Sequence, residues 1–455
     1  MRPFAKKIHL VGIGGAGMSP LAEVLMSRGH TVTGSDRAAS DASRRLETLG
    51  IKVQYNHEPN LVKGAELLVY SSAVKGDNPE RKYAADNGIP EIRRAEALGD
   101  VMRSNFTVCV AGTHGKTTTT SLVGTVLTDA KMSPTVLAGG MLRSVGSHAI
   151  VGNGGIVVAE ADEYDRSFLA MYPTMAVITN IDADHLDCYA DLDDIKDAFV
   201  AFTDKVPFDG AVIACIDDDG VRSVLPRIRR SLFTYGTDAE ADFRAVGVKF
   251  DGARTEFSVV YKGKLEMGRV SIGIPGLHNV MNTLAALAVA VETGIRFSVA
   301  ADSVSKFLGV GRRFEIVGRA GGVTVVDDYA HHPKEIAATI AAARRCGYGR
   351  IAAVFQPHLY TRTRDFSDQF AESLGAADIV VVTDIYKARE QPIPGVSAED
   401  IVGKIKGVDA YYVRDKNDVI GVLRDKVGNG DVVIFMGAGD IWEVAGAFVA
   451  GKSGE

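Results

Sequence analysis

A glycine loop that ends in a lysine and a threonine is the first feature of the sequence that could do chemistry. In VAGTHGKTTTT the residues Lys116 and Thr117 follow two glycines, after an apolar segment and ahead of a predicted helix. Glycines let backbone N–H groups turn toward a phosphate, and the helix N-terminus adds positive potential. Lys116 suits the terminal phosphates of a nucleotide and the Thr117 hydroxyl suits Mg²⁺. The loop is shorter than the usual phosphate-binding loop, because Val110 stands where that loop has its first glycine.

Two groups of carboxylates follow apolar segments that are predicted to be strands. EADEYD at 160–165 comes after IVVA, and NIDADHLD at 180–187 comes after MAVIT. The carboxyl ends of parallel strands meet at one edge of a sheet, so both groups are expected beside Lys116. Mg²⁺ prefers oxygen ligands. One acidic strand end is commonly a solvated loop, but two of them favour a metal site that includes Glu160 and His185.

A second glycine-rich turn lies near the amino terminus. GIGGAG at 12–17 matches GxGxxG after a predicted strand, and Asp36 follows 19 residues after the last glycine. The pattern predicts a diphosphate at the N-terminus of a helix. It does not say whose diphosphate this is. These residues alone leave open an NAD-dependent dehydrogenase and a domain that binds a UDP-sugar.

Strands and helices alternate along the chain, which predicts an α/β protein of three domains. KIHLVGI, HTVTGSD and LLVYSSAV are apolar predicted strands with helical patterns between them, and they predict a Rossmann-like N-terminal domain at 1–102. Residues 103–311 are predicted to form a central P-loop-type ATPase α/β domain with added antiparallel strands. Four further apolar strands predict a Rossmann-like C-terminal domain at 312–455.

The composition favours a protein with packed cores and no nucleic-acid partner. The 455 residues are 46% hydrophobic with a net charge of −6, and the densest basic stretch, 227–230, is short. Cys109, Cys188, Cys215 and Cys346 form no CxxC pair, so thiols in a reducing compartment are expected. The chain has no apolar run of about 18 residues and its start is a predicted strand. We therefore expect a cytoplasmic protein, monomer or homodimer, without a membrane span.

Together the motifs resemble the Mur ligases, which build the peptide of the peptidoglycan precursor. The similarity covers essentially the whole chain and rests, in order, on GIGGAGMSPLAEVL, GSDR, AGTHGKTTTT, EADEYDRSFL, NIDADHLD, GLHNVMNTLAA, GVGRRFE, DDYAHHPKEI and FQPHLYTRTRDF. The resemblance implies ATP-dependent ligation of L-alanine to the carboxylate of UDP-N-acetylmuramate through an acyl phosphate. It implies ATP and Mg²⁺ as cofactors, with Mn²⁺ as an alternative metal.

Two positions depart from the family pattern. Tyr164 stands where many members have serine, and the member that attaches a murein tripeptide to the same UDP-sugar also has tyrosine there. Leu359 stands where other members have arginine, which leaves that position without an implied role. GIGGAGM and IDADHLD fit alanine ligation better than tripeptide ligation. The tripeptide ligase therefore remains the alternative within the family, and the dehydrogenase the alternative outside it.

The resemblance also implies the residues of each subsite. Those for ATP are Gly112, Thr113, His114, Gly115, Lys116, Thr117, Thr118, His278, Asn279, Asn282, Arg313 and Asp328. Those for the metal are Thr117, Glu160 and His185. Those for the UDP-sugar are Gly12, Gly14, Gly15, Ala16, Gly17, Met18, Ser35, Asp36, Ser71 and Ser72. Those for the amino acid are Tyr329, His332, His358 and Arg362.

Catalytic roles are implied for Lys116, His185, Arg313 and His358. Lys116 is expected at the ATP phosphates, and His185 at a second metal that bridges the γ-phosphate and the sugar carboxylate. Spacing does not separate Arg312 from Arg313 at the phosphates, although the second is favoured. The base that takes a proton from the amine is open among His331, His332 and His358.

Overall fold

The computed structural model describes residues 5–143, 146–183, 188–388 and 390–452. They form two compact units. The first holds the chain up to Val246, together with Ser258–Val270 and Met281–Phe307, and the second holds Gly247–Phe257, Ser271–Val280 and the chain from Leu308 onward. No helix in the described ranges has the length and apolar character needed to cross a bilayer.

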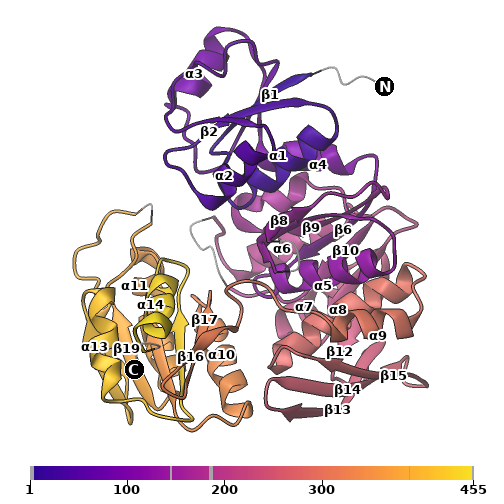
Figure 1. The fold of residues 1–455 in the computed structure, drawn as a ribbon. Helices are drawn as coiled ribbons and strands as arrows, with labels where there is room; N and C mark the ends of the chain where they lie inside the picture. The colour runs from indigo at the N-terminus through magenta and orange to yellow at the C-terminus, as the bar shows by residue number, and fades with distance from the viewer. Residues whose placement is uncertain (1–4, 144–145, 184–187, 389, 453–455) are drawn as a thin grey trace. The chain divides into compact units, whose positions relative to one another are not determined.

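The first sheet belongs to the first unit and has five parallel strands in the order β3-β2-β1-β4-β5 (Figure 1). The strands are β1 (Lys7–Val11), β2 (Thr31–Ser35), β3 (Lys52–Gln54), β4 (Leu67–Tyr70) and β5 (Glu91–Arg93). The helices are α1 (Met18–Ser27), α2 (Asp41–Thr48), α3 (Pro79–Asp86) and α4 (Arg94–Met102). The strand order reverses direction between β1 and β4, and ligands of doubly wound sheets bind outside the carboxyl ends at such a point. The predicted Rossmann-like arrangement is confirmed.

The second sheet lies mostly in the first unit, and its ten strands follow the order β15-β14-β13-β12-β11-β10-β6-β9-β7-β8. The strands are β6 (Phe106–Ala111), β7 (Thr135–Leu142), β8 (Ser147–Ile150), β9 (Ile156–Ala161), β10 (Met175–Ile178), β11 (Ala211–Cys215), β12 (Ser231–Gly236), β13 (Phe243–Asp251), β14 (Arg254–Tyr261) and β15 (Leu265–Ile272). The helices are α5 (Lys116–Asp129), α6 (Leu192–Thr203), α7 (Asp219–Val224), α8 (Leu277–Glu292) and α9 (Phe297–Ser305), with 3₁₀ turns η1 (Tyr164–Ala170) and η2 (Leu225–Arg227). Strand β6 pairs in parallel with β9 and with β10, so the segments that follow these three strands leave one edge together.

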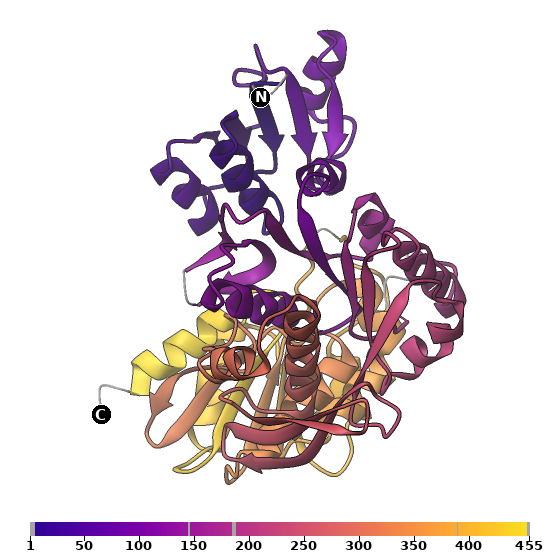
Figure 2. The ribbon, with the colours of Figure 1, turned by 90° about the vertical axis from the view of Figure 1, so that its right-hand side faces the viewer.

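The third sheet belongs to the second unit and has the order β16-β17-β21-β18-β19-β20. The last part of the chain in this unit is drawn in yellow in Figure 2. Its strands are β16 (Glu315–Ala320), β17 (Val323–Asp328), β18 (Ile351–Phe355), β19 (Ile379–Thr383), β20 (Asp409–Val413) and β21 (Val432–Met436). The helices are α10 (Pro333–Arg345), α11 (Tyr360–Leu374), α12 (Glu399–Lys404), α13 (Val419–Arg424) and α14 (Trp442–Lys452), with the 3₁₀ turn η3 (Lys416–Asp418). Only β16 runs antiparallel to its neighbour among the pairs described.

Helices cover both faces of this third sheet, which explains its continuous apolar strands. Ile336 of α10 and Phe370 of α11 pack with Phe355 on one face. Phe448 of α14 packs with Val354 on the other face, so neighbouring residues of β18 enter different cores. A parallel strand buried on both sides has no solvent face and reads as an unbroken hydrophobic run.

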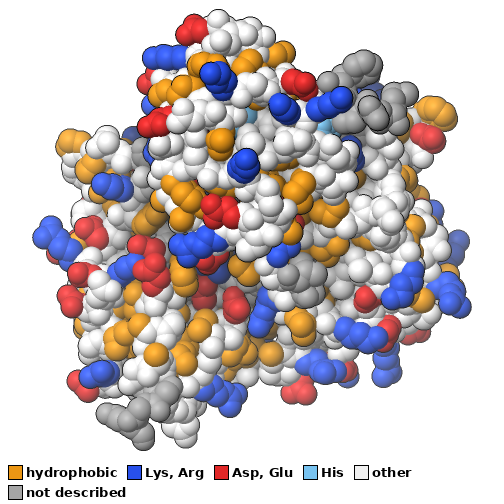
Figure 3. Space-filling model, turned by 45° about the horizontal axis from the view of Figure 1, so that its top comes forward, with side chains coloured by type: hydrophobic (Ala, Val, Ile, Leu, Met, Phe, Trp, Pro, Cys, Tyr) orange, Lys and Arg blue, Asp and Glu red, His pale blue; other side chains and the backbone are white. Residues whose placement is uncertain are grey.

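Charged side chains are spread over the surface. On the face drawn in Figure 3, basic and acidic side chains of the described residues are interspersed, with apolar side chains between them. This pattern is typical of a protein surface in contact with water.

The turn between β6 and α5 needs a glycine at position 112. Gly112 has a φ of +141°, and a Cβ there would lie 2.0 Å from Thr179 Oγ1 and 3.1 Å from the backbone nitrogen of Asn180. Side chains rarely adopt this backbone conformation, and the space that a methyl group needs is already filled.

We predict that Gly112→Ala lowers the free energy of unfolding by about 1–3 kcal/mol, because the backbone is strained and Thr179 must move. Gly76→Ala is the matched control in the same unit, since no heavy atom lies within 4 Å of its added Cβ and its φ is ordinary. The control is expected to change stability by less than about 0.5 kcal/mol. Thermal denaturation of both variants measures the difference, and equal melting temperatures would contradict the prediction.

Candidate active site

The loop between β6 and α5 is held in shape by the residues that follow β10. The backbone nitrogen of His114 donates to Asn180 Oδ1 at 2.7 Å, and Asn180 Nδ2 donates to the His114 carbonyl at 2.9 Å. Thr179 Oγ1 donates to the same carbonyl at 2.6 Å. The Thr113 hydroxyl accepts from the backbone nitrogen of Asp182 at 2.9 Å. Two strand ends therefore build one loop, and the sequence analysis had not assigned Thr179 or Asn180 a role.

Lys116 is the first residue of α5 and its ammonium group lies inside the loop. It donates to the carbonyl oxygens of Gly112 at 2.6 Å and Thr113 at 3.2 Å, and to the Glu163 carboxylate at 2.8 and 3.0 Å. The Glu163 side chain is buried, and that of Lys116 is 12% exposed. Although burial opposes it, the charges of Glu163, Asp162 and Glu160 raise the pKa of Lys116 above its ordinary value. The ammonium therefore stays charged, and a phosphate that enters the loop competes with Glu163.

Glu163 belongs to the carboxylate cluster that the sequence singled out, but its contact with Lys116 was not predicted. The analysis expected Glu160 to face the loop, and the position of Glu163 in the chain does not distinguish the two. The 3₁₀ turn η1 begins directly afterwards, and the Tyr189 hydroxyl donates to the Glu163 carbonyl at 2.6 Å. The irregular turn at this point determines that Glu163 rather than Glu160 contacts the lysine, and hydrophobic periodicity does not reveal such a turn.

Thr117 and Glu160 form the part of the expected metal site that the structure describes. Thr117 Oγ1 donates to the Glu160 carboxylate at 3.0 and 3.2 Å, and Gly139 donates its backbone N–H to Glu160 Oε2 at 2.7 Å. A hydroxyl and a carboxylate are hard oxygen donors, and they fit Mg²⁺ that takes its other ligands from phosphates and water. The described residues contain no cluster of three or more His, Cys, Asp or Glu side chains that could hold a metal alone. The predicted ligand His185 lies in 184–187, outside the described residues.

The predicted adenine residues lie near the start of α8. In the first unit, Asn282 is buried and its Oδ1 accepts from Thr119 Oγ1 at 3.2 Å. A Cβ at Gly115 would lie 2.6 Å from that oxygen, so Asn282 lies directly against the phosphate loop. In the second unit, His278 is exposed, whereas Asn279 is buried and donates from Nδ2 to the Pro275 carbonyl at 2.7 Å.

Arg312 and Arg313, which spacing did not separate, differ in their contacts. The guanidinium of Arg312 donates to Asp327 at 3.2 Å and to the carbonyls of Gly437 at 2.7 Å and Gly439 at 3.2 Å. Arg313 has a longer ion pair of 3.7 Å with Glu335. Arg312 ties the segment ahead of β16 to the third sheet, so Arg313 is the better candidate for an incoming phosphate.

Asp328 ends β17 and organises the turns beside these arginines. It is buried, and its two carboxylate oxygens accept from the backbone nitrogens of Phe314 and Ala330, both at 2.8 Å. Burial raises the pKa of Asp328 above its ordinary value, against the opposing effect of Arg313 and of these two hydrogen bonds. The Tyr329 ring follows, and the guanidinium groups of Arg312 and Arg313 both lie 5.1 Å from its centre.

The residues expected to receive the amino acid gather beyond the ends of β17 and β18. The ring centres of His331 and His358 are 6.2 Å apart, and His332 lies 5.0 Å from the Phe366 ring. Arg362, on the first turn of α11, is only 9% exposed. Burial, together with the charges of Arg362 and Arg313, lowers the pKa of His331 to about 4 against the opposing charge of Glu335. The imidazole of His331 is therefore neutral at pH 7.

The first glycine loop is fixed by β2. The backbone nitrogens of Gly12 and Ile13 donate to the Ser35 carbonyl at 2.8 and 2.9 Å, and that of Gly14 donates to Asp36 Oδ2 at 2.8 Å. The buried Ser35 hydroxyl donates to Glu80 Oε2 at 2.6 Å. Ser35 therefore shapes the loop through its backbone carbonyl, and Asp36 through its side-chain carboxylate.

Glu80 anchors a buried polar network beneath this loop. Its carboxylate contacts His9 at 3.0 Å and His57 at 2.8 Å, in addition to Ser35. These hydrogen bonds outweigh the effect of burial, which raises the pKa, and hold the pKa of Glu80 below its ordinary value. The network was not predicted, because a lone glutamate after Asn78 and Pro79 reads as an ordinary helix start.

Ser71 and Ser72 follow β4 on the other side of the switch point. A Cβ at Gly12 would lie 3.5 Å from Ser71 Cβ, so the two segments are adjacent. The structure thus brings the predicted residues of the UDP-sugar site to one edge of the first sheet.

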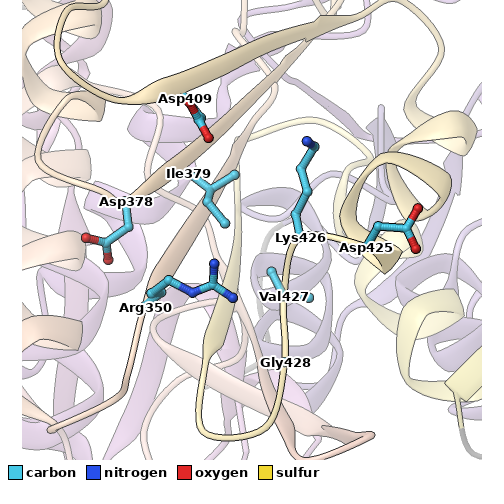
Figure 4. A pocket seen from close by; sticks show the side chains of 8 residues that line it. All are labelled: Arg350, Asp378, Ile379, Asp409, Asp425, Lys426, Val427 and Gly428. Atoms are coloured by element: carbon cyan, nitrogen blue, oxygen red, sulfur yellow. The ribbon is translucent and has the colours of Figure 1, made fainter.

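Two cavities differ in their relation to these residues. A cavity of about 160 Å³ lies beside the end of β5 and the start of η1, and its lining residues are Ser72, Arg93, Arg94, Ala95, Glu96, Asp162, Tyr164, Asp165, Arg166, Ser167 and Ala170. A larger cavity of about 520 Å³ lies at the amino ends of strands of the third sheet (Figure 4), and its lining residues are Arg350, Asp378, Ile379, Asp409, Asp425, Lys426, Val427 and Gly428. None of the predicted site residues lines the larger one, which lies at the edge opposite to that where such sheets bind ligands.

Comparison with known proteins assigns the family. The sequence matches the models of the Mur ligase family catalytic domain at residues 7–106, the Mur ligase middle domain at 110–290 and the Mur ligase glutamate ligase domain at 312–439. Relatives at almost half identity match along nearly the whole chain. The chain belongs to the Mur ligase family.

Two similar proteins within the family carry the same name. The chain is 48% identical to the UDP-N-acetylmuramate–L-alanine ligase of Salinibacter ruber over 98% of this chain and 94% of that protein. It is 47% identical to the ligase of the same name from Trichlorobacter lovleyi, over 98% of each chain.

Solved structures agree with this similarity. The UDP-N-acetylmuramate–alanine ligase of Thermotoga maritima matches with a TM-score of 0.84 and 30% identity, over 98% of this chain and 99% of that one. A murein peptide ligase from Psychrobacter arcticus matches with a TM-score of 0.72 and 25% identity, over 98% of both chains.

We predict that Lys116→Met abolishes ADP release and also destabilises the fold. The variant leaves the Glu163 charge buried without its ammonium partner, which costs about 3–5 kcal/mol. The double variant Lys116→Met/Glu163→Gln removes that charge and is expected to regain much of the lost melting temperature while activity stays absent.

Melting temperatures and coupled ADP assays on both variants separate the two roles of Lys116. Substantial turnover in either variant would refute its role at the phosphates. If Lys116→Met alone melts at the same temperature as the wild type, the ion pair does not contribute to stability as predicted.

Arg312 and Arg313 are predicted to respond differently to substitution. Arg313→Ala is expected to lower kcat/KM for ATP by about 10–100-fold, because a charge-assisted contact to phosphate is lost. Its melting temperature should change little. Arg312→Ala is expected to lower the melting temperature, because Asp327 and two carbonyls lose their donor. Steady-state kinetics and thermal denaturation of both variants check this, and a reversed pattern would exchange the roles.

Proposed function

We propose that the protein is an ATP-dependent ligase that joins L-alanine to the carboxylate of UDP-N-acetylmuramate, with release of ADP and phosphate. The observation that carries the proposal is the 46–48% identity to proteins named for this reaction, over 96–99% of the chain. The contacts around Lys116 and the chemistry of the third sheet support it.

The first step activates the carboxylate of the sugar. A carboxylate oxygen attacks the γ-phosphorus of ATP, the bond from that phosphorus to the ADP oxygen breaks, and an acyl phosphate forms. The attack brings anions together, so Lys116 and Arg313 offset the developing charge. Thr117 and Glu160 would hold Mg²⁺, with Mn²⁺ as an alternative, and the metal would supply further positive charge to offset that of the phosphates.

The second step forms the amide bond. The nitrogen of L-alanine attacks the acyl carbon, a tetrahedral intermediate forms, and phosphate leaves with the electrons of the C–O bond. Arg362 pairs with the alanine carboxylate, and Tyr329 and His332 line the same place. A base must remove a proton from the nitrogen. Since a useful base has a pKa near the working pH, His331, with a pKa of about 4, is the weakest of the three candidates, and His358 and His332 remain.

A ligase that adds murein tripeptide to the same UDP-sugar is the second candidate. The observation that favours it is Tyr164, which the tripeptide ligases share, and Tyr164 lines the cavity beside Arg94. The structural match to a murein peptide ligase is weaker than that to an alanine ligase. The dehydrogenase interpretation leaves the loop at Lys116 without a role and loses its support with membership in the Mur ligase family.

We also propose the organisation that accompanies this chemistry. The segment 1–102 binds the UDP-sugar, 103–311 binds ATP, and 312–455 binds the amino acid. The cytoplasm is the expected compartment, because ATP is the phosphate donor. A monomer or a homodimer suits a reaction whose expected residues all belong to one chain.

The first test is ADP release with Mg-ATP, UDP-N-acetylmuramate and one acceptor at a time. We predict release that depends on L-alanine, with glycine and L-serine accepted about 10–200-fold less efficiently in kcat/KM, since a small pocket distinguishes such side chains by about 1–3 kcal/mol. Omission of the UDP-sugar is the control and should stop release.

Other outcomes redirect the proposal. Release only with murein tripeptide would favour the second candidate. If neither L-alanine nor murein tripeptide causes ADP release, both reactions are refuted and the family membership stays intact.

A further inference from the structure

We propose that Glu390 is a positioning residue for the amino acid, because its carboxylate holds the first turn of α11 and with it Arg362. The inference rests on the proposed function, because it takes L-alanine as the ligand of Arg362. Glu390 was not among the residues expected from the sequence, since it lies outside every motif that carries the family resemblance.

Helix α11 begins without a cap of its own. Its N-cap residue is Leu359, which makes no side-chain cap hydrogen bond. The first N–H groups of a helix have no partner within it, and serine, threonine, asparagine or aspartate usually accepts from one of them at this position. Leucine has no side-chain acceptor. The start of α11 therefore needs an acceptor from elsewhere in the chain.

Glu390 supplies that acceptor. Thr361 is the second residue of α11, and its backbone nitrogen donates to Glu390 Oε2 at 3.0 Å while its hydroxyl donates to Oε1 at 2.5 Å. Negative charge at the N-terminus of a helix also interacts favourably with the helix dipole. Arg362 is the next residue of the same turn. The carboxylate that fixes Thr361 therefore fixes the backbone from which the Arg362 side chain extends.

The backbone of Leu359 shows that the start of α11 is held in an unfavourable conformation. Leu359 has a φ of +71° and a ψ of 137°, which residues with side chains rarely adopt. Its backbone nitrogen donates to the Tyr386 carbonyl at 3.0 Å, and its carbonyl accepts from the Thr363 backbone nitrogen at 3.1 Å and from the Thr363 hydroxyl at 2.8 Å. Such strain persists only where surrounding contacts enforce it, and it gathers at ligand sites.

Tyr386 holds the other side of this turn. The Tyr386 backbone nitrogen donates to the Pro357 carbonyl at 2.8 Å, and the backbones of His358 and Tyr386 form an isolated parallel bridge. The rings of His358 and Tyr386 are stacked, with centres 5.8 Å apart and planes at 15°. Tyr386 and Glu390 both lie in the segment that follows β19. This one segment therefore contacts His358 and the helix start that carries Arg362.

The position of Arg362 matters because L-alanine is small. Its carboxylate offers Arg362 a charged contact, whereas its methyl group buries little surface. A displacement of about 1 Å can cost a reaction about 100-fold in rate. The expected ATP residues of this unit depend on other contacts, since Arg313 pairs with Glu335 and Asp328 holds the turns beside β17. Loss of Glu390 should therefore affect the amino acid and spare ATP.

The test compares Glu390→Ala and Glu390→Gln with Glu372→Ala as the control. Glu372 is an exposed residue near the other end of the same helix. We expect kcat/KM for L-alanine to fall about 10–100-fold in Glu390→Ala, because hydrogen bonds to a charged group are lost and Arg362 is displaced. Glu390→Gln should lose less, since its amide keeps one acceptor oxygen. KM for ATP and for UDP-N-acetylmuramate should stay unchanged, and the control should behave like the wild type.

A double-mutant cycle tests whether Glu390 acts through the start of α11. Thr361→Val removes the hydroxyl donor and keeps the backbone N–H group, so it should lower kcat/KM for L-alanine less than Glu390→Ala does. In the Glu390→Ala background the same change should have little further effect, because the contact is already lost. If Glu390→Ala melts early, Glu390→Gln at an unchanged melting temperature carries the test.

Four results would overturn the inference in distinguishable ways. Unchanged kinetics in both Glu390 variants would refute the role of Glu390 and leave the proposed function intact. Equal losses for L-alanine, ATP and the UDP-sugar would make Glu390 purely structural. Additive effects of Thr361→Val and Glu390→Ala would refute the route through α11. A wild-type protein without ADP release dependent on L-alanine would refute the proposed function, and the inference with it.

Discussion

The edge at which parallel strands end is the constraint on which the remaining structure depends. Most of the predicted site residues lie where the backbone leaves a sheet at the carboxyl end of a strand. The loop at Lys116 follows β6, Glu160 lies near the end of β9, and Asn180 follows β10, the two strands that flank β6. The same rule brings Asp328 and His358 to one edge of the third sheet.

The two glycine loops on such edges differ in where the adjacent cation comes from. In the second sheet the cation is part of the loop, because Lys116 opens the helix and its ammonium is enclosed by loop carbonyls. In the first sheet the loop is filled with glycines and alanine, and Arg94 reaches it from another strand end. A lysine inside the loop follows a single phosphate as a point charge, whereas an arginine from outside offers a planar fork to several oxygens. Only the first arrangement is visible as a local motif.

This difference explains how much of the site could be predicted from the sequence. The three-domain α/β fold follows from apolar runs broken by helical periodicity, and Lys116, Thr117 and Glu160 follow from motifs whose spacing is local. The contact of Glu163 with Lys116 and that of Arg94 with the first glycine loop were missed because they arise when segments distant in sequence meet. The sequence analysis also could not separate Arg312 from Arg313, since adjacent residues share every local signal. The backbone separates them: Arg312 has a left-handed φ of +59° and its guanidinium donates into the third sheet.

The Lys116–Glu163 pair links the stability of the loop to its use. An ammonium enclosed by protein without a counterion would tend to lose its proton, because burial disfavours charge. Glu163 prevents this, and its carboxylate occupies a place on Lys116 that suits a phosphate oxygen. In the proposed reaction, a nucleotide phosphate at Lys116 would replace the Glu163 carboxylate, so one anion would be exchanged for another instead of charge being introduced into an uncharged cavity. Such an exchange would lower the net free energy gained when a phosphate contacts the lysine, but the ion pair keeps the loop intact when no phosphate is bound. Glu163 would then remain in the same carboxylate segment as the predicted metal ligand Glu160.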